Sequence, residues 1–490
     1  MKRLLAVSIV GLFALTVLYA AIPAGASGTT TGVFPDRIIT VSKTSQRDNA
    51  YTIGIDSAQA GLWWVELVSN DGVLVVVQVY RTDDARNPLS STDLRAPGDV
   101  SKQVPIAAAT SYTVAFIYSG SQGSATLREH FLGQPSLEMM PHAPIQIFGN
   151  QAFTQENGVV WGSGSESDPY IIQGWTINCK GNGPALMVAD TTAHFIVRNV
   201  VASDSGQYHA SINLVNTDNA ALQDIETYGN ELGIIVVSSK DVEVRNCLLG
   251  SSRMGIIVQD SLNVRLASSI IDCDMGIQAS LCEGVTIEGN SISDGRFGVY
   301  GERLSDSIVA HNEFSRCEIA ILLAQSQGCS VSSNKVTDGI SSTGAICIIS
   351  DSKCVIDDNT VESASGNAMV IHVSTDITVA GNNLALGYSG LLVSVSTDIV
   401  VKMNVFRLNQ WGLSVTDTKA CVVIGNDFIN NMNGQVESSM SQLALSIEGS
   451  GNYWSDYTGA DADGDGIGDT PYSIASGILD YYPMMQPCTT

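Results

Sequence analysis

The chain has little positive charge and few residues that restrict its backbone. Its 490 residues hold 24 Lys and Arg against 49 Asp and Glu, which gives a formal net charge of −25. Nucleic acid and anionic membrane are therefore excluded as main partners, because phosphate binding needs clustered Lys and Arg. Only 13 residues are Pro, which excludes collagen and Pro-rich stalks.

Motifs built on cysteine and asparagine are also missing. None of the ten Cys forms a C-x-x-C pair, so zinc ribbons and thioredoxin-like redox centres are excluded. No N-x-S/T sequon occurs, so N-glycosylation at that motif is not expected. By contrast, 44% of the residues are hydrophobic. That apolar content is ample for a buried core and excludes a disordered polyelectrolyte.

The N-terminus predicts export. Lys2 and Arg3 precede an apolar run from Leu4 to Ile22, and the small residues Ala24-Gly25-Ala26 follow. This order is typical of a secretory signal peptide over residues 1–26, with an uncleaved anchor as the alternative. We therefore expect a secreted or cell-surface protein, with no membrane contact beyond an N-terminal anchor.

Residues 33–134 have the pattern of short strands separated by turns. Runs such as "GLWWVELVS", "GVLVVVQVY" and "SYTVAFIYSG" are bounded by Gly, Asn and Asp. Strong β-formers between such turn residues predict a small antiparallel β-sandwich. Residues 135–158 are expected to form a linker and an N-terminal cap for the next domain.

Beyond residue 184 the sequence repeats itself. Small residues recur every 21 to 26 residues, and each is followed by apolar residues at alternate positions. Self-similarity at this period predicts a solenoid, and an apolar spacing of two predicts strands rather than helices. We therefore predict a right-handed parallel β-helix with coils of about 22 residues over residues 159–445. The recurring residues are Ala185, Ser211, Gly233, Gly255, Gly276, Gly298, Ala320, Gly344, Ala368, Gly390 and Gly412.

A column of Asn is expected to run along this solenoid. Asn tolerates the left-handed conformation at a bend, and its amide can bond the same amide on the next coil. A position repeated this often indicates a building rule rather than a binding site. Asp241, Asp306, Asp376 and Asp398 also recur before a strand and are interpreted as turn residues. The predicted ladder comprises Asn199, Asn246, Asn290, Asn312, Asn334, Asn359, Asn382, Asn404 and Asn426.

Most cysteines are expected to be small buried thiols within strands. Cys329 and Cys354 occupy equivalent positions on adjacent coils. Stacked Cα atoms about 4.8 Å apart are compatible with a disulfide. A disulfide and two stacked thiols are both left open by the sequence.

The segment 446–490 is expected to form a C-terminal cap with a calcium loop. Asp461, Asp463, Asp465 and Asp469 stand at positions one, three, five and nine of the loop, Gly466 stands at six, and Ile467 can offer its carbonyl at seven. Position twelve is Tyr472 rather than an acid, so the loop is not an EF-hand. Another carboxylate, such as Asp456 or Asp480, would complete a structural calcium site.

Three segments together resemble a known family. They are "GSGSESDPYIIQGWTIN" at 162–178, the 22-residue coils, and the terminal "GNYWSDYTGADADGDGIGDTPY". Over residues 145–487 the chain resembles the NosD-like periplasmic copper-binding family, and most of all its exported archaeal, methanogen-type members. The resemblance implies a parallel β-helix of the carbohydrate-binding and sugar-hydrolase type, and a role in copper maturation for the founding members.

The residues themselves argue against copper. The six His form no H-x-H or H-x₃-H pair, and the Met residues form no run. Copper ligation by imidazole or thioether therefore has little support. Met139-Met140-x-His142 is the best fragment, and a plain linker is the other interpretation.

Catalysis is also poorly supported. Asn216-Thr217-Asp218 matches a short polygalacturonase motif without its companions, and Asp357-Asp358 adjoins the Asn column. A hydrolase needs two carboxylates that flank the scissile bond. We therefore expect a non-catalytic cell-surface protein that binds glycans or envelope proteins along the solenoid face. A polysaccharide hydrolase or lyase with an unrecognised acidic site is the alternative, and a copper-related maturation factor is the third hypothesis.

Overall fold

The computed structural model describes residues 139–362, 364–474 and 477–489, together with eight strands between residues 37 and 133. The predicted signal peptide, residues 1–26, lies outside the described residues. Contacts between residues divide the chain into two units, Met1–Ser136 and Leu137–Thr490. In the part of the chain that is described, no helix has the length and hydropathy needed to cross a membrane.

The N-terminal unit contains two antiparallel sheets of four strands each, in the orders β1-β8-β3-β6 and β2-β7-β4-β5. Alternate residues of its strands are buried, such as Val75, Val77 and Val79 on β4. This alternation gives each strand one core-facing side. The strands are β1 (Arg37–Lys43), β2 (Ala50–Ser57), β3 (Gly61–Asn70), β4 (Val73–Arg81), β5 (Ser90–Leu94), β6 (Val104–Ile106), β7 (Thr110–Gly120) and β8 (Gly123–Gly133).

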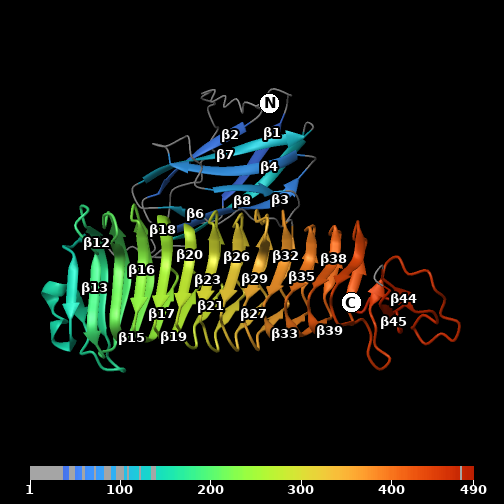
Figure 1. Ribbon diagram of the computed structural model, residues 1–490. Helices are drawn as coiled ribbons and strands as arrows, with labels where there is room; N and C mark the ends of the chain where they lie inside the picture. The colour runs from blue at the N-terminus through green and yellow to red at the C-terminus, as the bar shows by residue number, and fades with distance from the viewer. Residues whose placement is uncertain are drawn as a thin grey trace, which may run out of the picture. The chain divides into compact units, whose positions relative to one another are not determined.

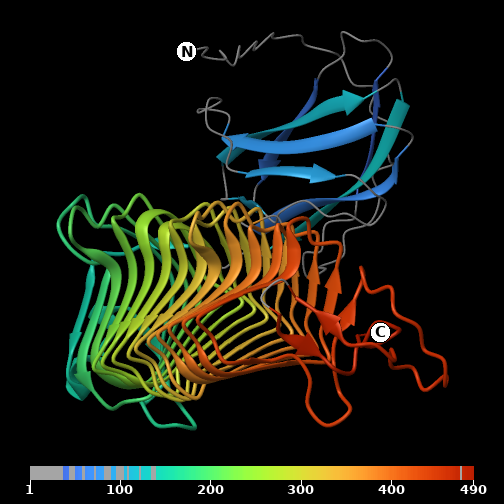
Figure 2. The same ribbon diagram turned by 45° about the vertical axis from the view of Figure 1, so that its right-hand side comes forward.

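The second unit is a parallel β-helix of about 13 turns (Figures 1 and 2). Equivalent residues on neighbouring coils are mostly 22 positions apart, as in the pair Ile234 and Ile256. The predicted fold class is therefore confirmed. Parallel pairing begins at Met140 and Ile145 and continues to Trp454.

The first coils combine short strands with longer ones that continue round the corners, the longest being β15 with 19 residues. Two short 3₁₀ helices, η1 (Asn150–Ala152) and η2 (Gln155–Asn157), lie between β10 and β11. The strands are β9 (Met140–Pro141), β10 (Ile145–Phe148), β11 (Val159–Trp161), β12 (Tyr170–Asn178), β13 (Leu186–Thr191), β14 (Phe195–Ser203) and β15 (Ala210–Tyr228). Only β11 pairs antiparallel, with β12.

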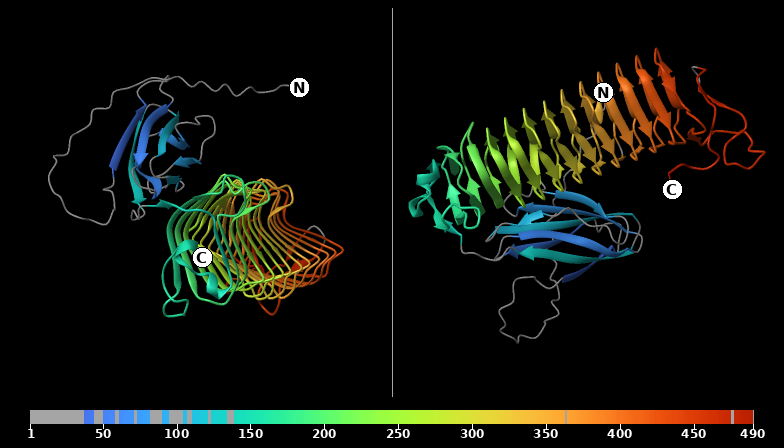
Figure 3. Two further views of the ribbon diagram at one scale, coloured as in Figure 1. Left: turned by 90° about the vertical axis from the view of Figure 1, so that its left-hand side faces the viewer. Right: turned by 90° about the horizontal axis from the view of Figure 1, so that it is seen from below.

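From residue 232 onward each coil contributes one strand to each of three parallel stacks, named A, B and C in chain order. Figure 3 shows the strands following one another along the solenoid. Stack A contains β16 (Leu232–Val237), the second parts of β18 (Leu248–Gln259) and β20 (Ile270–Ser280), β23 (Phe297–Glu302), β26 (Ile319–Ala324), β29 (Gly344–Ile349), β32 (Asn367–His372), β35 (Ser389–Ser394), β38 (Trp411–Thr416) and β41 (Gly434–Ser439).

Stacks B and C complete each coil. Stack B contains β17 (Lys240–Arg245), β19 (Leu262–Ala267), β21 (Thr286–Glu288), β24 (Ile308–Ala310), β27 (Ser330–Ser332), β30 (Val355–Asp357), β33 (Thr375–Ala380), β36 (Thr397–Lys402), β39 (Lys419–Ile424) and β42 (Leu443–Ala444). Stack C begins with the first parts of β18 and β20 and continues with β22 (Ser291–Ser293), β25 (Glu313–Ser315), β28 (Lys335–Thr337), β31 (Thr360–Glu362), β34 (Asn383–Ala385), β37 (Val405–Arg407), β40 (Asp427–Ile429) and β43 (Tyr453–Trp454).

The core is a set of inward-facing columns of aliphatic and aromatic side chains. Phe406, Phe428, Trp454 and Tyr472 stack in sequence, with ring centroids 5.0, 4.6 and 4.3 Å apart. The last ring belongs to the hairpin of β44 (Tyr472–Ser473) and β45 (Leu479–Asp480). The aromatic column therefore joins the solenoid to its C-terminal cap.

Left-handed residues form the corners of the coils. Of the 38 described non-glycine residues with positive φ, 12 are Asp and 6 are Asn, the residues that best tolerate this conformation. Asp241, Asp306, Asp376 and Asp398 have φ of 54°, 46°, 56° and 57°. Their interpretation as turn residues is confirmed.

Candidate functional site

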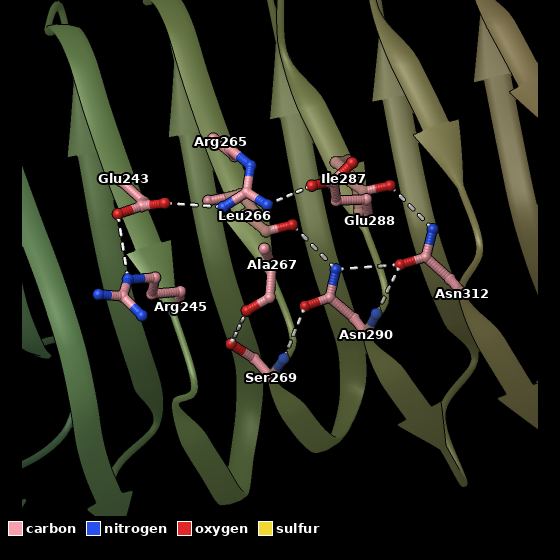
Figure 4. Close-up of polar contacts among 10 residues, drawn as sticks. All are labelled: Glu243, Arg245, Arg265, Leu266, Ala267, Ser269, Ile287, Glu288, Asn290 and Asn312. Carbon is pink, nitrogen blue, oxygen red and sulfur yellow. Dashed lines mark hydrogen bonds and ion pairs between the residues drawn. The ribbon is translucent and has the colours of Figure 1, made fainter.

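A ladder of buried Asn side chains runs along the corner between stacks B and C (Figure 4). The Asn290 backbone N–H and Nδ2 both donate to Oδ1 of Asn312, at 2.9 and 3.0 Å. Asn312 makes the same two bonds to Asn334, at 3.0 and 3.0 Å. The pattern continues with Asn359, Asn382, Asn404 and Asn426.

Both ends of this ladder are closed by other polar groups. The Ser269 N–H donates to Oδ1 of Asn290 at 3.0 Å. At the other end, Asn426 bonds to Asn452, and the Asn452 N–H donates to Oδ2 of Asp480 at 2.8 Å. Trp454 Nε1 donates to the same oxygen at 2.9 Å. Asp480 is fully buried, and desolvation raises the pKa of its carboxyl group.

Two of the nine predicted ladder residues lie elsewhere. Asn199 and Asn246 have φ of 49° and 54° and occupy the corner position that precedes the ladder. In the coil of Asn246, the ladder position belongs to Cys247, whose backbone N–H donates to Ser269 Oγ. The sequence interpretation had merged two roles: one residue turns the chain in the left-handed region, and the next points inward and bonds to the neighbouring coil.

The remaining ladder Asn have no capacity left for a ligand. Asn382 Nδ2, for example, also donates to the carbonyl oxygens of Ile356 and Ala380. Its side chain is fully buried, as are those of its neighbours. Because buried polar groups need partners, this arrangement stabilises the stack and offers nothing to solvent.

A second polar column follows the corner between stacks A and B. Its hydroxyl groups accept from the backbone N–H of the preceding coil, as Ser261 Oγ does from Ser239 at 3.1 Å. Asp351 replaces a hydroxyl residue in this column and accepts from the backbone N–H groups of Ser326 and Ile349. Desolvation raises the pKa of Asp351 to about 7, although both bonds oppose the shift.

The residues considered for catalysis also serve the corners. Thr217 is fully buried and bonds to Ser239 Oγ, and Asn216 Nδ2 donates to Asp190 at 2.8 Å. Asp358 is a left-handed corner residue with φ of 54°. Desolvation, with a contribution from Asp358, raises the pKa of Asp357. The acid that contacts the first motif from the preceding coil, Asp190, is itself a left-handed corner residue with φ of 56°.

The cysteines stay as thiols. None of the ten forms a disulfide in the structure, and nine of them are buried. Cys329 and Cys354 neighbour each other on successive coils, where the Val355 N–H donates to the Cys329 carbonyl at 3.0 Å. The proximity of Cys329 and burial both raise the pKa of the Cys354 thiol. Of the two alternatives left open by the sequence, the structure has two stacked thiols at Cys329 and Cys354 rather than a disulfide.

The Asp-rich loop gathers three carboxylates. One oxygen each from Asp461, Asp463 and Asp465 lies within 4.8 Å of the others. Asp461 Oδ1 accepts from the N–H groups of Gly464 and Asp465, at 2.7 and 3.2 Å. These bonds fold the loop back on its first carboxylate. Such converging hard oxygens suit calcium.

The other predicted members of this site have different contacts. Asp469 Oδ2 accepts from the Ala462 N–H at 2.7 Å, and Ile467 forms a β-bridge with Met484. Asp480 closes the Asn ladder, and Asp456 accepts from the Tyr472 hydroxyl at 3.2 Å. Neither Asp456 nor Asp480 belongs to the group of three carboxylates.

The outer face of stack B carries a charged network near the start of the ladder (Figure 4). Arg265 bridges two coils through Glu243, at 2.7 Å, and Glu288. Arg245 pairs with Glu243 at 3.2 Å. Isolated surface pairs contribute little to stability, but shared partners fix the orientation of these planar groups.

Copper does not fit the residues that the structure describes. The group of three closely spaced His, Cys, Asp or Glu found there consists of carboxylates alone, whereas copper prefers imidazole and sulfur. His142 Nδ1 lies 2.6 Å from the Ala143 carbonyl oxygen, and its ring contacts Trp175. The clustered carboxylates therefore supply neither the imidazole nor the sulfur donors that copper prefers.

Two family models match the solenoid. "Right handed beta helix region" covers residues 233–384, and "Periplasmic copper-binding protein (NosD)" covers residues 325–459. The solenoid is thus similar to that family over residues 325–459. The β-helix is right-handed, as predicted from the sequence. The family description names a periplasmic protein.

Several solved structures match this chain at low identity and low TM-score. An α-1,3-glucanase catalytic unit from Streptomyces thermodiastaticus matches at 10% identity and a TM-score of 0.37, covering 83% of this chain and 96% of that chain. A DFA-IIIase from Arthrobacter chlorophenolicus matches at 11% and 0.36, covering 47% and 80%. The periplasmic alginate epimerase AlgG matches at 11% and 0.37, covering 57% and 85%. No curated protein matches. These likenesses carry no argument about activity.

The sequence interpretation missed a second Asn ladder at the corner between stacks C and A. The Asn409 N–H and Nδ2 donate to Oδ1 of Asn431, at 3.0 and 3.2 Å, and Asn431 donates to Gln435 at 2.8 Å. Asn409 and Asn431 each come five residues after a member of the main ladder, Asn404 and Asn426. That constant offset could have revealed them.

Proposed function

We propose that this NosD-like chain is an exported, non-catalytic protein that binds glycans on the outer face of its solenoid. The observation that carries the proposal is the presence of outward planar polar side chains that hold one another in place. Arg198 Nε donates to Gln173 at 2.7 Å, Arg265 bridges Glu243 and Glu288, and Arg407 bridges Asn383 and Glu362. Fixed donors and acceptors of this kind match the hydroxyl groups of sugars.

The contacts of the candidate acids support a non-catalytic role. Asp358 serves a corner, and Asp351 and Asp480 are buried within polar columns. A glycosidase needs two carboxyl groups across an open groove. These buried and corner positions do not supply that arrangement.

A glycan array followed by a reducing-end assay on each hit tests the proposal. We expect retention of at least one glycan class without release of reducing ends. Failure to bind any glycan would contradict the proposal, and capture of an envelope protein alone would replace glycan with protein as the partner. Release of reducing ends would instead establish the hydrolase or lyase.

Export is part of the proposal. Its support is the basic, apolar and small-residue order of segment 1–26 and the periplasmic family description. We expect the mature protein in the extracellular or envelope fraction to begin at Ser27. N-terminal sequencing that found Met1 or Lys2 there would show a retained anchor.

We also propose that the Asp461–Asp469 loop binds structural calcium. Its support is the approach of Asp461, Asp463 and Asp465 and the ties between this loop and the end of the solenoid. The Gly468 N–H donates to Pro483 at 2.8 Å, and the Met484 N–H donates to the Asn452 carbonyl at 2.9 Å. Calcium would therefore stabilise the segment that covers the last coil.

A further inference from the structure

An exposed ridge follows the corner between stacks C and A in the C-terminal coils. We define the corner ridge as Leu386, Tyr388, Leu408, Trp411 and Met432. Tyr388 is 50% exposed, and the Trp411 ring is partly exposed. The Trp411 N–H donates to the Tyr388 carbonyl at 2.8 Å, so the two aromatic residues belong to neighbouring coils.

The ridge presents rings in a fixed place. A Cβ on Gly434 would lie 2.6 Å from a carbon of the Trp411 six-membered ring, so this ring covers the next coil where only glycine leaves room. Beneath the ridge, Asn409 Oδ1 accepts from the Gly387 N–H at 2.9 Å, and Asn409 bonds onward to Asn431. The second Asn ladder therefore holds this corner from inside.

Two leucines on the ridge occupy a conformation that leucine disfavours. Leu386 and Leu408 have φ of 61° and 58° and are exposed. Asp294 and Asn430 fill equivalent corner positions on other coils with φ of 62° and 51°. Bulky apolar residues at exposed left-handed positions are unfavourable for folding alone, and such outliers concentrate at functional sites.

A polar triad lies beside the ridge at the end of stack C. Arg407 Nε donates to Asn383 at 3.1 Å, and its Nη2 donates to Glu362 at 3.0 Å. The small, fully buried Ala385 stands between Glu362 and Arg407 in the same outer row. The triad thus supplies guanidinium, amide and carboxylate groups in one hydrogen-bonded set, and its Arg and Glu charges cancel.

We propose that the corner ridge and the triad of Glu362, Asn383 and Arg407 form a binding subsite for a neutral polysaccharide. This inference rests on the proposed glycan-binding function and names its place and ligand class. Aromatic faces match the apolar C–H faces of sugar rings, and the triad matches their hydroxyl groups. Trp411 pairs with Ser389, the residue after Tyr388, so the two aromatic residues lie on neighbouring coils about 4.8 Å apart and are offset by one position along the chain.

The charge of the protein selects against anionic glycans. The formal net charge is −25, and Arg407 is already paired with a carboxylate. A polyuronate would meet like charge at long range and no unpaired cation in the triad. A neutral glycan meets neither obstacle.

Affinity electrophoresis in gels with a soluble β-glucan, a galactomannan, a xylan or polygalacturonate tests this inference on the mature full chain. We expect at least one neutral polymer to retard the wild-type protein and polygalacturonate to leave it unretarded. Tyr388→Ala and Trp411→Ala should weaken retardation about tenfold, and Trp411→Phe should restore part of it. Tyr208→Ala is the matched control, because Tyr208 is also an exposed aromatic residue, at 74%, but it lies on a different coil outside the corner ridge.

Each outcome decides a different statement. If the wild-type protein binds no polymer on the gels or on the array, the proposed function fails together with the subsite. If it binds and the Tyr388 and Trp411 variants bind equally well at unchanged melting temperature, the subsite is wrong and glycan binding stands. Retention by polygalacturonate alone would overturn the assignment to neutral polymers.

Discussion

Single residues at the corners set local strain. Val373 has φ of 53° and is 47% exposed, although a β-branched residue is a strong outlier in the left-handed region. Val395, on the next coil, has φ of 51°. Most corners instead use Asp, Asn or Gly, which adopt this conformation at lower cost.

We therefore expect Val373→Asn to raise the free energy of unfolding by about 1 kcal/mol. Urea unfolding followed by circular dichroism measures the change. The matched control is Val355→Asn, because Val355 is 42% exposed but lies within β30, where Asn is unfavourable. A destabilised Val373→Asn protein would show that the valine is not strained.

A ladder residue should respond in the opposite direction. Asn382→Ala removes the acceptor for the Asn359 N–H and Nδ2 and the donor to Asn404. Because these groups are buried, we expect a loss of about 3–5 kcal/mol in the same urea experiment. Asn246→Ala, at an exposed corner outside the ladder, should cost about 1 kcal/mol. Equal losses would contradict the distinction between corner and ladder.

At the scale of the structural elements, the polar column between stacks A and B makes stability depend on pH. Asp351 is an acid within the hydroxyl column, and burial raises its pKa in the folded protein from the usual 3.8 to about 7. A raised pKa means that the folded state binds the proton more tightly than the unfolded state. This contribution to stability is full below pH about 4 and is lost as the pH rises to about 7 and beyond.

Asp351→Ser restores the hydroxyl found elsewhere in the column. We expect the free energy of unfolding of the variant to exceed that of the wild type at pH 8 by on the order of 2–4 kcal/mol, with the difference shrinking toward pH 4. Unfolding curves across this range measure it. Asp398→Ser is the matched control, because it removes a carboxylate at an exposed corner outside the hydroxyl column. A difference that stays constant with pH would contradict burial of the Asp351 charge.

The calcium loop is an element whose ligand should stabilise the fold. At a concentration 100 times its Kd, calcium should raise the free energy of unfolding by about 2.7 kcal/mol. We expect chelation to lower the melting temperature of the wild-type protein and to leave Asp463→Ala unchanged. Asp274→Ala, an exposed acid outside the loop, should keep the full response. If chelation leaves the melting temperature of the wild-type protein unchanged, the proposed calcium site is wrong.

The sequence predicted the repeating elements and failed where repetition stopped. Regular spacing placed Asn312 and Asn382 in one column, because one coil fixes the position of the next. An offset of one residue was enough to misplace Asn246, since adjacent positions turn the chain or point inward. Asn452 and Asp480 were not predicted as ladder members, because 26 and 28 residues separate successive partners there. Only the folded cap brings them into line.

At the scale of the whole molecule, the C-terminal cap covers the last coil, whose strand edges have no further coil to pair with. Trp454 and Tyr472 extend the aromatic column into the cap, and Met484 pairs with the last coil at Tyr453. An uncovered edge of a parallel stack is a template for pairing with another chain.

A chain that ends at residue 448 should therefore self-associate. It lacks Asn452, Trp454 and Asp480, which complete the ladder and the aromatic column. We expect size-exclusion chromatography with light scattering to show oligomers or aggregates for this variant. The full mature chain serves as the control, and a monodisperse monomer from the truncated chain would contradict a protective cap.

The 22-residue register between coils also has an evolutionary consequence. A duplication or deletion that begins and ends at the same point of the coil leaves every column continuous and both caps intact. The length of the solenoid can then change in increments of about 4.8 Å without any change in the type of residues that fill its core. Duplication or deletion of whole coils can therefore change the length of the solenoid and leave the residues at its two ends unchanged.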